Sequence, residues 1–98
     1  MARVELAPEI VEDFDRLLAH QAQHKVADAA ARIQEIIQAI EVLAHNPLIG
    51  QPVANGKREL VIGRKARGYM ALYQYVDAID TVFVLAVRSQ REAGYTRL

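Results

Sequence analysis

Three short apolar runs in the C-terminal half of the chain constrain the fold more than any other feature. They cover residues 60–62, 69–76 and 81–87 and are rich in Val, Ile, Thr, Tyr and Phe. These residue types favour strands, and the runs are too short for the helices of a compact domain. Residues 63–68 form a basic turn bracketed by glycines, and residues 77–80 form a short polar connection. The sequence therefore predicts an antiparallel three-strand meander.

Upstream of the meander, the sequence predicts a short strand followed by a helix. Residues 2–6 alternate weakly in polarity, and we expect them to form a strand at a sheet edge. Pro8 suits the first turn of the helix, because its missing N–H needs no partner there. The helix should fade around residues 20–24. Its apolar side chains recur at the spacing of one helical face: Ile10, Phe14, Leu17 and Leu18.

A second and longer helix is predicted over residues 25–44. It ends at His45-Asn46-Pro47, because proline disfavours helical geometry in the residue before it. Residues 48–56 then have to cross from the helices to the sheet. Apolar side chains form a continuous stripe at helical spacing: Val26, Ala29, Ile33, Ile36, Ile37, Ile40 and Leu43.

This order of elements predicts an α+β fold of the form β-α-α-β-β-β. We expect one domain over residues 1–98, in which a short N-terminal strand leads into an antiparallel α-helical hairpin. The hairpin should pack on one face of an antiparallel sheet that the C-terminal meander completes.

Composition excludes several classes of protein. The chain has no cysteine, which excludes disulfides, thiol chemistry and cysteine-based metal sites. No apolar run reaches the roughly 20 residues of a membrane span, and the N-terminus lacks the apolar segment of a signal peptide. We therefore expect a cytoplasmic protein with no membrane contact.

Charge is distributed unevenly between the two halves. Residues 1–56 carry four basic and eight acidic side chains, whereas residues 57–98 carry eight basic and four acidic ones. Such asymmetry favours an anionic partner for the C-terminal half. Alternatively, the two halves simply complement each other.

Metal and phosphate sites are not expected. His20 and His24 have the i, i+4 spacing of helical metal ligands, but the HExxH context and a third ligand are missing. Two solvent-facing polar residues explain them better. Gly63 and Gly68 bracket a turn between strands and do not open a helix, so they form no phosphate loop. We expect no metal and no cofactor.

The cations of the meander are the best candidates for a binding site. Antiparallel pairing brings the start of the second strand and the end of the third strand to one end of the sheet. We expect five basic side chains to converge on that rim, where they would bind the target: Arg64, Lys65, Arg67, Arg88 and Arg91.

Tyrosines near this rim allow two interpretations each. Tyr69, Tyr73 and Tyr75 share a strand face and could stack on a ligand, but half-buried strand residues are the favoured interpretation. In the tail, Tyr95 with Arg91 nearby could serve a nuclease as acid or base plus phosphate clamp. Tyr95 could equally pack back onto the sheet.

Several segments together carry a resemblance to a known family. They read IIQAIEVLAHNPLIGQPV at 36–53, RELVIG at 58–63, GYMALY at 68–73 and VLAVRSQRE at 84–92. Their order and spacing resemble the ParE branch of the ParE/RelE toxin superfamily over nearly the full chain. The resemblance implies the toxin of a type II toxin–antitoxin module, often called a plasmid stabilisation protein.

The resemblance also implies partners. An antitoxin would wrap over the helices and sheet of the toxin and silence it. The second helix is alanine-rich and apolar over a wide arc, so we expect an antitoxin helix or strand to cover the hairpin and an open sheet edge. ParE-like members poison DNA gyrase, and RelE-like members cleave mRNA in the ribosomal A site.

Departures from the RelE pattern favour a gyrase inhibitor that performs no chemistry. Val61, Gly63 and Met70 stand where RelE-like nucleases place cations, and Ser89 stands where many relatives carry histidine. A RelE-like mRNA interferase remains the alternative, with Arg91 and Tyr95 as its catalytic residues and Arg64 or Arg67 as a substitute clamp. A further alternative is a degenerate, non-toxic module that only binds its antitoxin.

Overall fold

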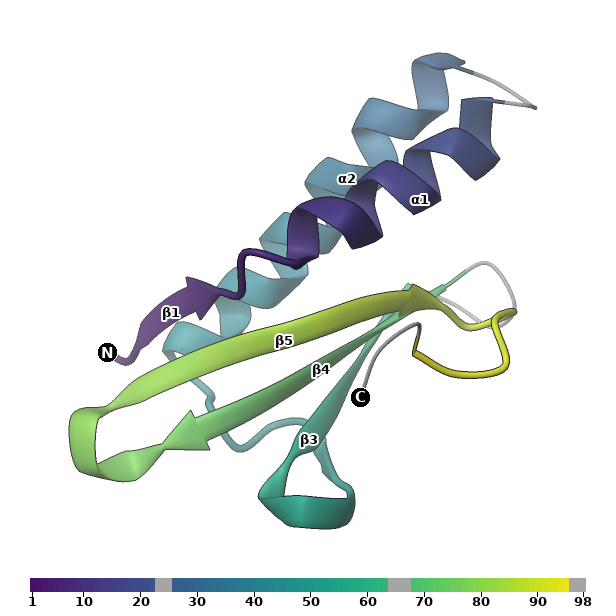
Figure 1. Cartoon of the computed structure of the whole chain (residues 1–98). Helices are drawn as coiled ribbons and strands as arrows, with labels where there is room; N and C mark the ends of the chain where they lie inside the picture. Colours follow the sequence, from purple (N-terminus) through teal and green to yellow (C-terminus); the bar gives the residue numbers. More distant parts are fainter. Residues whose placement is uncertain (23–25, 64–67, 96–98) are drawn as a thin grey trace.

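The computed structural model describes residues 1–22, 26–63 and 68–95 and contains two helices and five strands (Figure 1). The predicted α+β fold is confirmed. In chain order the elements are β1 Arg3–Leu6, α1 Ile10–Ala22, α2 Val26–Glu41, β2 Gln51–Pro52, β3 Arg58–Ile62, β4 Tyr69–Val76 and β5 Thr81–Ser89. Single turns of 3₁₀ helix lie at Val42–Ala44, Ala54–Gly56 and Asp77–Ile79.

The five strands form one mixed sheet in the order β1-β5-β4-β3-β2. β5, β4 and β3 pair antiparallel, as the meander predicted, and β2 pairs antiparallel with β3. β1 lies at an edge, as expected, but runs parallel to β5, with Arg3 opposite Thr81 and Leu6 opposite Val84. Parallel pairing needs a long connection, and the helical hairpin between β1 and the meander supplies it.

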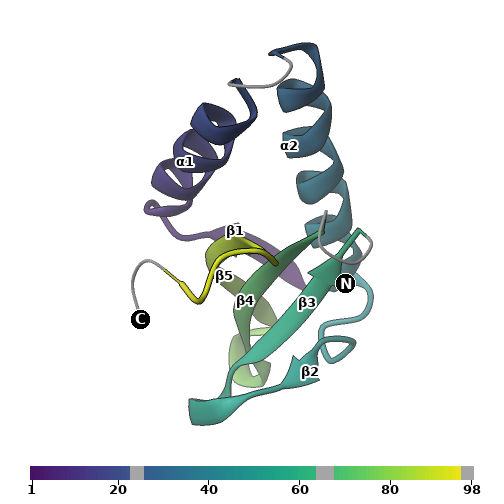
Figure 2. The same ribbon diagram turned by 90° about the vertical axis from the view of Figure 1, so that its right-hand side faces the viewer.

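Both helices cover the same face of the sheet (Figure 2). Ile10 and Leu17 of α1 and Ile36 and Ile40 of α2 are buried in one cluster against the strands. The strand side chains in this cluster are Ile62, Tyr69, Ala71, Tyr73, Val82, Val84 and Val87.

The strand tyrosines belong to this core. Tyr69 and Tyr73 are buried, and Tyr75 packs against the cluster at its margin. The favoured interpretation of these tyrosines as packed strand residues is therefore confirmed. Stacking surface for a ligand has to come from elsewhere.

Side chains that alternate with the core residues point to the opposite side of the sheet, which we call the helix-free face. Glu59 and Val61 of β3 lie there, together with Met70 and Leu72 of β4, because their neighbours along the strands belong to the core.

A β-bulge determines where Arg88 lies. Tyr73 pairs with Val84 but Leu72 pairs with Ala86, so Leu85 is an extra residue in β5. The bulge shifts the alternation by one residue, and consequently Val84 and Val87 both face the helices. Arg88 therefore lies on the helix-free face, opposite Met70 of β4.

The linker after α2 is held by contacts from the sheet. Tyr73 accepts a hydrogen bond from the Gly50 backbone N–H at 2.8 Å, and Arg58 Nη1 donates to the carbonyls of Leu48 at 3.1 Å and Gly50 at 2.8 Å. These contacts place β2 beside β3, a short pairing that the sequence did not predict. The helix predicted over residues 25–44 ends shortly before Pro47, as expected, but its α-helical part ends at Glu41 and Val42–Ala44 form a 3₁₀ turn.

Candidate functional site

The end of β5 and the start of β4 meet at one end of the sheet, as the meander predicted. Ser89 pairs with Tyr69, and the Gln90 backbone N–H donates to the Gly68 carbonyl at 3.0 Å. Arg88 and Arg91 belong to this end, which we call the C-terminal rim (residues 88–95). Three of the predicted cations lie outside the described residues: Arg64, Lys65 and Arg67.

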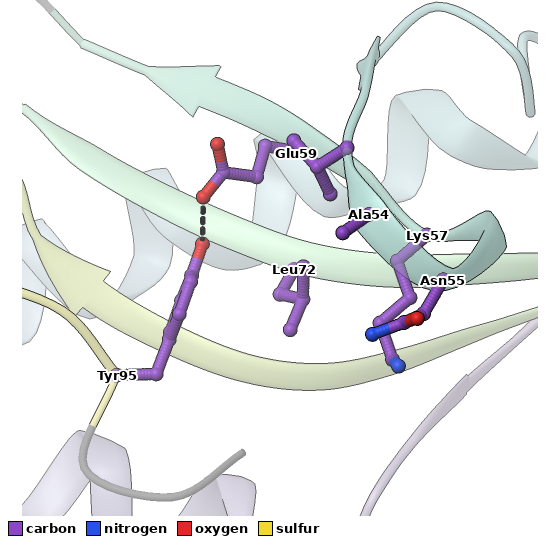
Figure 3. A pocket seen from close by; sticks show the side chains of 7 residues that line it. Ala54, Asn55, Lys57, Glu59, Leu72 and Tyr95 are labelled. Carbon is purple, nitrogen blue, oxygen red and sulfur yellow. Dashed lines mark hydrogen bonds between the residues drawn. The ribbon is translucent and has the colours of Figure 1, made fainter.

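Tyr95 folds back across the helix-free face (Figure 3). Its phenol O–H donates to Glu59 Oε2 at 2.6 Å. Leu72 is only 6% exposed although it lies away from the helices, and it lines the same pocket as Tyr95. Of the two interpretations of Tyr95, the structure therefore has the residue packed onto the sheet.

The environment of Tyr95 makes its proton harder to remove. Burial raises the pKa of the Tyr95 phenol well above its usual range, and the hydrogen bond to the Glu59 carboxylate acts in the same direction. The Arg88 guanidinium opposes this shift without cancelling it. Tyr95 is consequently harder to ionise than an ordinary tyrosine.

Arg88 holds the rim together. Its Cζ lies 5.1 Å from the centroid of the Tyr95 ring, which is cation–π distance. Its Nη1 donates to the carbonyls of Ser89 at 3.2 Å and Glu92 at 2.9 Å. Within the described residues, the buried Nε of Arg88 and Nε2 of Gln90 have no hydrogen-bond partner.

Arg91 is the exposed cation of the rim. Its backbone N–H donates to Ser89 Oγ at 3.2 Å, so the serine hydroxyl fixes this turn. Val61, which the resemblance led us to expect at the position of a RelE cation, is 55% exposed. Met70, another such position, is half-buried beside Arg88.

A second polar cluster, which the sequence did not predict, joins α1 to β5. Asp13 is 1% exposed; its Oδ2 accepts the Val87 backbone N–H at 2.9 Å, and its Oδ1 accepts Arg16 Nη1 at 2.9 Å. Arg16 Nη2 donates to the Val87 carbonyl at 3.0 Å. These two side chains therefore satisfy the backbone of β5 beyond the end of β1.

The same arginine anchors the tail. Arg16 Nε and Nη2 donate to the two carboxylate oxygens of Glu92 at 2.7 Å and 3.1 Å, a bidentate pair. The hydrogen bond to Glu92 is the largest cause that raises the pKa of Arg16. Glu92 Oε2 also accepts the Ser89 backbone N–H at 3.2 Å. The rim is thus attached to the helices through Glu92 and to the sheet through Tyr95.

Metal binding and membrane insertion receive no support from the described parts of the chain. Among these residues there is no group of three or more His, Cys, Asp or Glu side chains that could hold a metal ion. His24 lies outside them. None of the helices so described is long and apolar enough to cross a membrane.

Comparison with protein families identifies the relatives of this chain. The model of the family described as the ParE toxin of the type II toxin–antitoxin system parDE matches residues 4–94. The chain belongs to the ParE toxin family. The resemblance inferred from the sequence is therefore confirmed, and as a type II toxin the chain has a cognate antitoxin as its partner.

Solved structures agree with this ParE fold. A chain of the chromosomal ParDE system from P. aeruginosa has a TM-score of 0.76 at 18% identity, with 91% of this chain and 96% of that chain covered. A chain of the RelBE2 toxin–antitoxin complex from Mycobacterium tuberculosis has a TM-score of 0.62 at 21% identity, with 91% of this chain and 98% of that chain covered. A mutant of the RelE toxin from E. coli in the free state has a TM-score of 0.65 at 15% identity, with 93% of this chain and 86% of that chain covered. No curated protein sequence matches this ParE-family chain significantly.

Proposed function

We propose that this ParE-family toxin inhibits DNA gyrase by binding to it and performs no chemistry of its own. The observation that carries the proposal is the match of residues 4–94 to the ParE toxin family. The hydrogen bond from the Tyr95 phenol to Glu59 at 2.6 Å supports the absence of chemistry, because this bond and burial both raise the pKa of the phenol. The tyrosine that a nuclease would use as acid or base is thus engaged as a hydrogen-bond donor.

The absence of cations at two positions on the helix-free face supports the same conclusion. Val61 and Met70 are apolar, so neither can hold a phosphate group. Electrostatic contacts to the developing charge of a transition state are typically worth about 2.7–4 kcal/mol each. Losing such contacts would slow RNA cleavage by orders of magnitude, whereas binding to a protein target does not depend on them.

The proposed target-binding surface is the C-terminal rim together with the basic turn before β4. It would present Arg88, Arg91 and Tyr95, with Arg64, Lys65 and Arg67 contributed by the turn. Clustered positive charge accelerates the encounter with an acidic partner surface and selects among partners. This surface suits a protein target and needs no cofactor.

The antitoxin would occupy a different part of the molecule. Val11 is 63% exposed on α1, which leaves apolar surface on the helical hairpin for an antitoxin helix. Among the described strands, β2 pairs only with Arg58 and Glu59, so β3 presents an open edge over its last residues. The matching edge of β5 is closed, because Asp13 and Arg16 bind the backbone of Val87. We therefore expect an antitoxin strand to add to β3.

A supercoiling assay with purified gyrase and the full chain tests the proposed function. We expect the wild-type chain to inhibit supercoiling and to arrest growth with DNA-damage signalling when it is expressed alone. Arg91→Ala should weaken the inhibition, whereas Arg3→Ala, which removes an exposed cation from β1, should leave it unchanged.

Two other outcomes would favour the alternatives. In the first, translation stops before DNA is damaged, and primer extension finds cuts in mRNA. If these cuts disappear in Tyr95→Phe and in Arg91→Ala, the toxin is a RelE-like interferase. If the folded chain is harmless at high expression and does not affect gyrase, it is a non-toxic binding module.

A further inference from the structure

A small pocket opens on the helix-free face on the side of Tyr95 that faces β3 and its preceding turn (Figure 3). Its volume is about 230 Å³. Pockets for cofactors and drug-sized ligands usually measure about 300–1,000 Å³, so this one suits a single side chain of a partner better than a small molecule. The lining residues are Val53, Ala54, Asn55, Lys57, Glu59, Leu72 and Tyr95.

The interior of the pocket combines an apolar surface with one available cation. Leu72 and the Tyr95 ring provide the apolar part, while Lys57 and Asn55 lie at the end away from Tyr95. Lys57 is half-buried, and within the described residues its ammonium forms no ion pair. A half-buried ammonium next to apolar surface is stabilised by an incoming carboxylate.

Glu59, the acidic residue of the pocket, already has a hydrogen-bond partner in Tyr95. Glu59 Oε2 accepts a hydrogen bond from the Tyr95 hydroxyl at 2.6 Å, at the opposite end of the pocket from Lys57. The Arg88 guanidinium, which is not among the lining residues, lies 5.1 Å from the centroid of the Tyr95 ring and adds positive charge nearby. Of these two cations, Lys57 is the one that lines the pocket.

We infer that the pocket binds an aliphatic side chain followed by a carboxylate in an acidic segment of the protein that the toxin inhibits. Leu72 and Tyr95 take the aliphatic group, and Lys57 pairs with the carboxylate. A nucleic-acid strand fits less well, because a pocket of about 230 Å³ accommodates a single side chain better than a nucleotide. The inference rests on the proposed function, in which the toxin acts by binding a protein.

NMR titration of the isotope-labelled full chain with short peptides tests this site. The probe is acetyl-Gly-Leu-Asp-Gly-amide, and the matched control is acetyl-Gly-Leu-Asn-Gly-amide. We expect the aspartyl peptide to cause saturable shifts at the amides of Lys57, Leu72 and Tyr95. The asparaginyl peptide should bind roughly two- to five-fold more weakly, because it lacks the charge that pairs with Lys57.

Variants separate the pocket from general charge effects. Lys57→Gln should reduce binding of the aspartyl peptide to that of the asparaginyl peptide, and Lys57→Arg should retain the difference. Arg3→Gln removes the same charge from the opposite edge of the sheet and should change nothing. Equal binding of both peptides, the absence of shifts at the pocket, or occupation of the pocket by a short oligothymidylate instead would overturn the inference.

The pocket and the gyrase proposal can fail separately. If the peptide binds at Lys57 but the chain does not inhibit supercoiling, only the gyrase target is wrong. If supercoiling is inhibited equally by wild type and Lys57→Gln and no peptide binds, only the pocket is wrong.

Discussion

The Asp13 carboxylate accepts a hydrogen bond from the Val87 backbone N–H at 2.9 Å, joining the first turn of α1 to the last core residue of β5. β1 ends opposite Val84, so no strand covers this part of β5. A buried N–H without a partner is costly, and a side chain here replaces the missing strand. The contact therefore fixes the position of α1 over the sheet.

Asp13→Asn should destabilise the fold strongly. The carboxylate accepts hydrogen bonds from the Val87 N–H and from Arg16, but the amide oxygen can accept only one of them. The amide NH₂ group would then face the other N–H donor. We expect a loss of about 2–4 kcal/mol in the free energy of unfolding, measured by urea denaturation. Asp15→Asn is the matched control, because Asp15 is exposed on the same helix. Equal effects of the two variants would contradict the role of Asp13.

Gly50→Ala should also destabilise the fold. A Cβ at this position would lie 2.6 Å from Cε1 and from the hydroxyl oxygen of Tyr73, and 2.8 Å from the Glu59 carbonyl. Because Tyr73 is fully buried, it cannot easily move away. We expect a loss of about 1–3 kcal/mol by thermal or urea unfolding. Gly94→Ala should have almost no effect, since a Cβ there meets nothing within 4 Å.

Local patterns in the sequence were sufficient to predict most of the fold. The β4 strand was predicted over residues 69–76 and is observed at Tyr69–Val76, because glycine and an acidic turn delimit a strongly apolar run. The end of the helical segment at Ala44, shortly before Pro47, follows from local sterics. β2 was missed because it depends on side-chain contacts that no local pattern reveals: Arg58 donates to the Gly50 carbonyl, and Tyr73, 23 residues away, accepts from the Gly50 N–H.

The site was harder to predict than the fold for physical reasons. Residues 81–87 are almost uniformly apolar, so nothing in them revealed the bulge that turns Arg88 toward the helix-free face. Asp13 lies three residues after Ile10, on the apolar side of α1, which was the available signal for burial. An acidic residue near a helix start has an ordinary explanation, however, in the helix dipole. Tyr95 and Glu59 are 36 residues apart and share no local pattern.

The two tyrosines that donate to carboxylates should titrate late. The hydrogen bond from Tyr75 to Asp80, at 2.6 Å, is the main cause that raises the pKa of Tyr75 to about 12. The folded state holds this proton more tightly than the unfolded state does. The hydrogen bond of Tyr75 therefore contributes its full stabilisation below pH of about 10 and loses it as the pH rises toward about 12. We therefore expect the pH titration of tyrosinate absorbance in the wild type, after subtraction of the same curve for Tyr75→Phe, to have its midpoint near pH 12.

Asp80→Asn provides the control for this titration. Removing the carboxylate removes the main cause of the shift, so the midpoint of Tyr75 should fall back toward the ordinary value of about 10. A midpoint in the wild-type protein that already equals the ordinary value would contradict the hydrogen bond. Tyr95→Phe should likewise remove a phenol that ionises late, because burial and Glu59 raise its pKa.

The bidentate pair of Arg16 and Glu92 should stabilise the tail measurably, although both side chains are 29% exposed. A double-mutant cycle with Arg16→Gln and Glu92→Gln should give a coupling free energy of about 0.5–1.5 kcal/mol that decreases with salt. Arg16→Gln alone should cost more than Glu92→Gln, because Arg16 also binds Asp13 and the Val87 carbonyl.

The pair of Arg3 and Glu5 is the matched control for this cycle. These charges are 3.6 Å apart on β1 and their side chains are 75% and 49% exposed, so solvent screens them and their coupling should be close to zero. If the two cycles give the same coupling, the geometry of the Arg16–Glu92 pair contributes nothing beyond surface charge. A larger coupling free energy for Arg16–Glu92 means that α1 fixes the position of the C-terminal rim, which includes Tyr95, relative to the sheet. In that case, Glu92→Gln should also weaken the hydrogen bond of Tyr95, visible as earlier ionisation of its phenol.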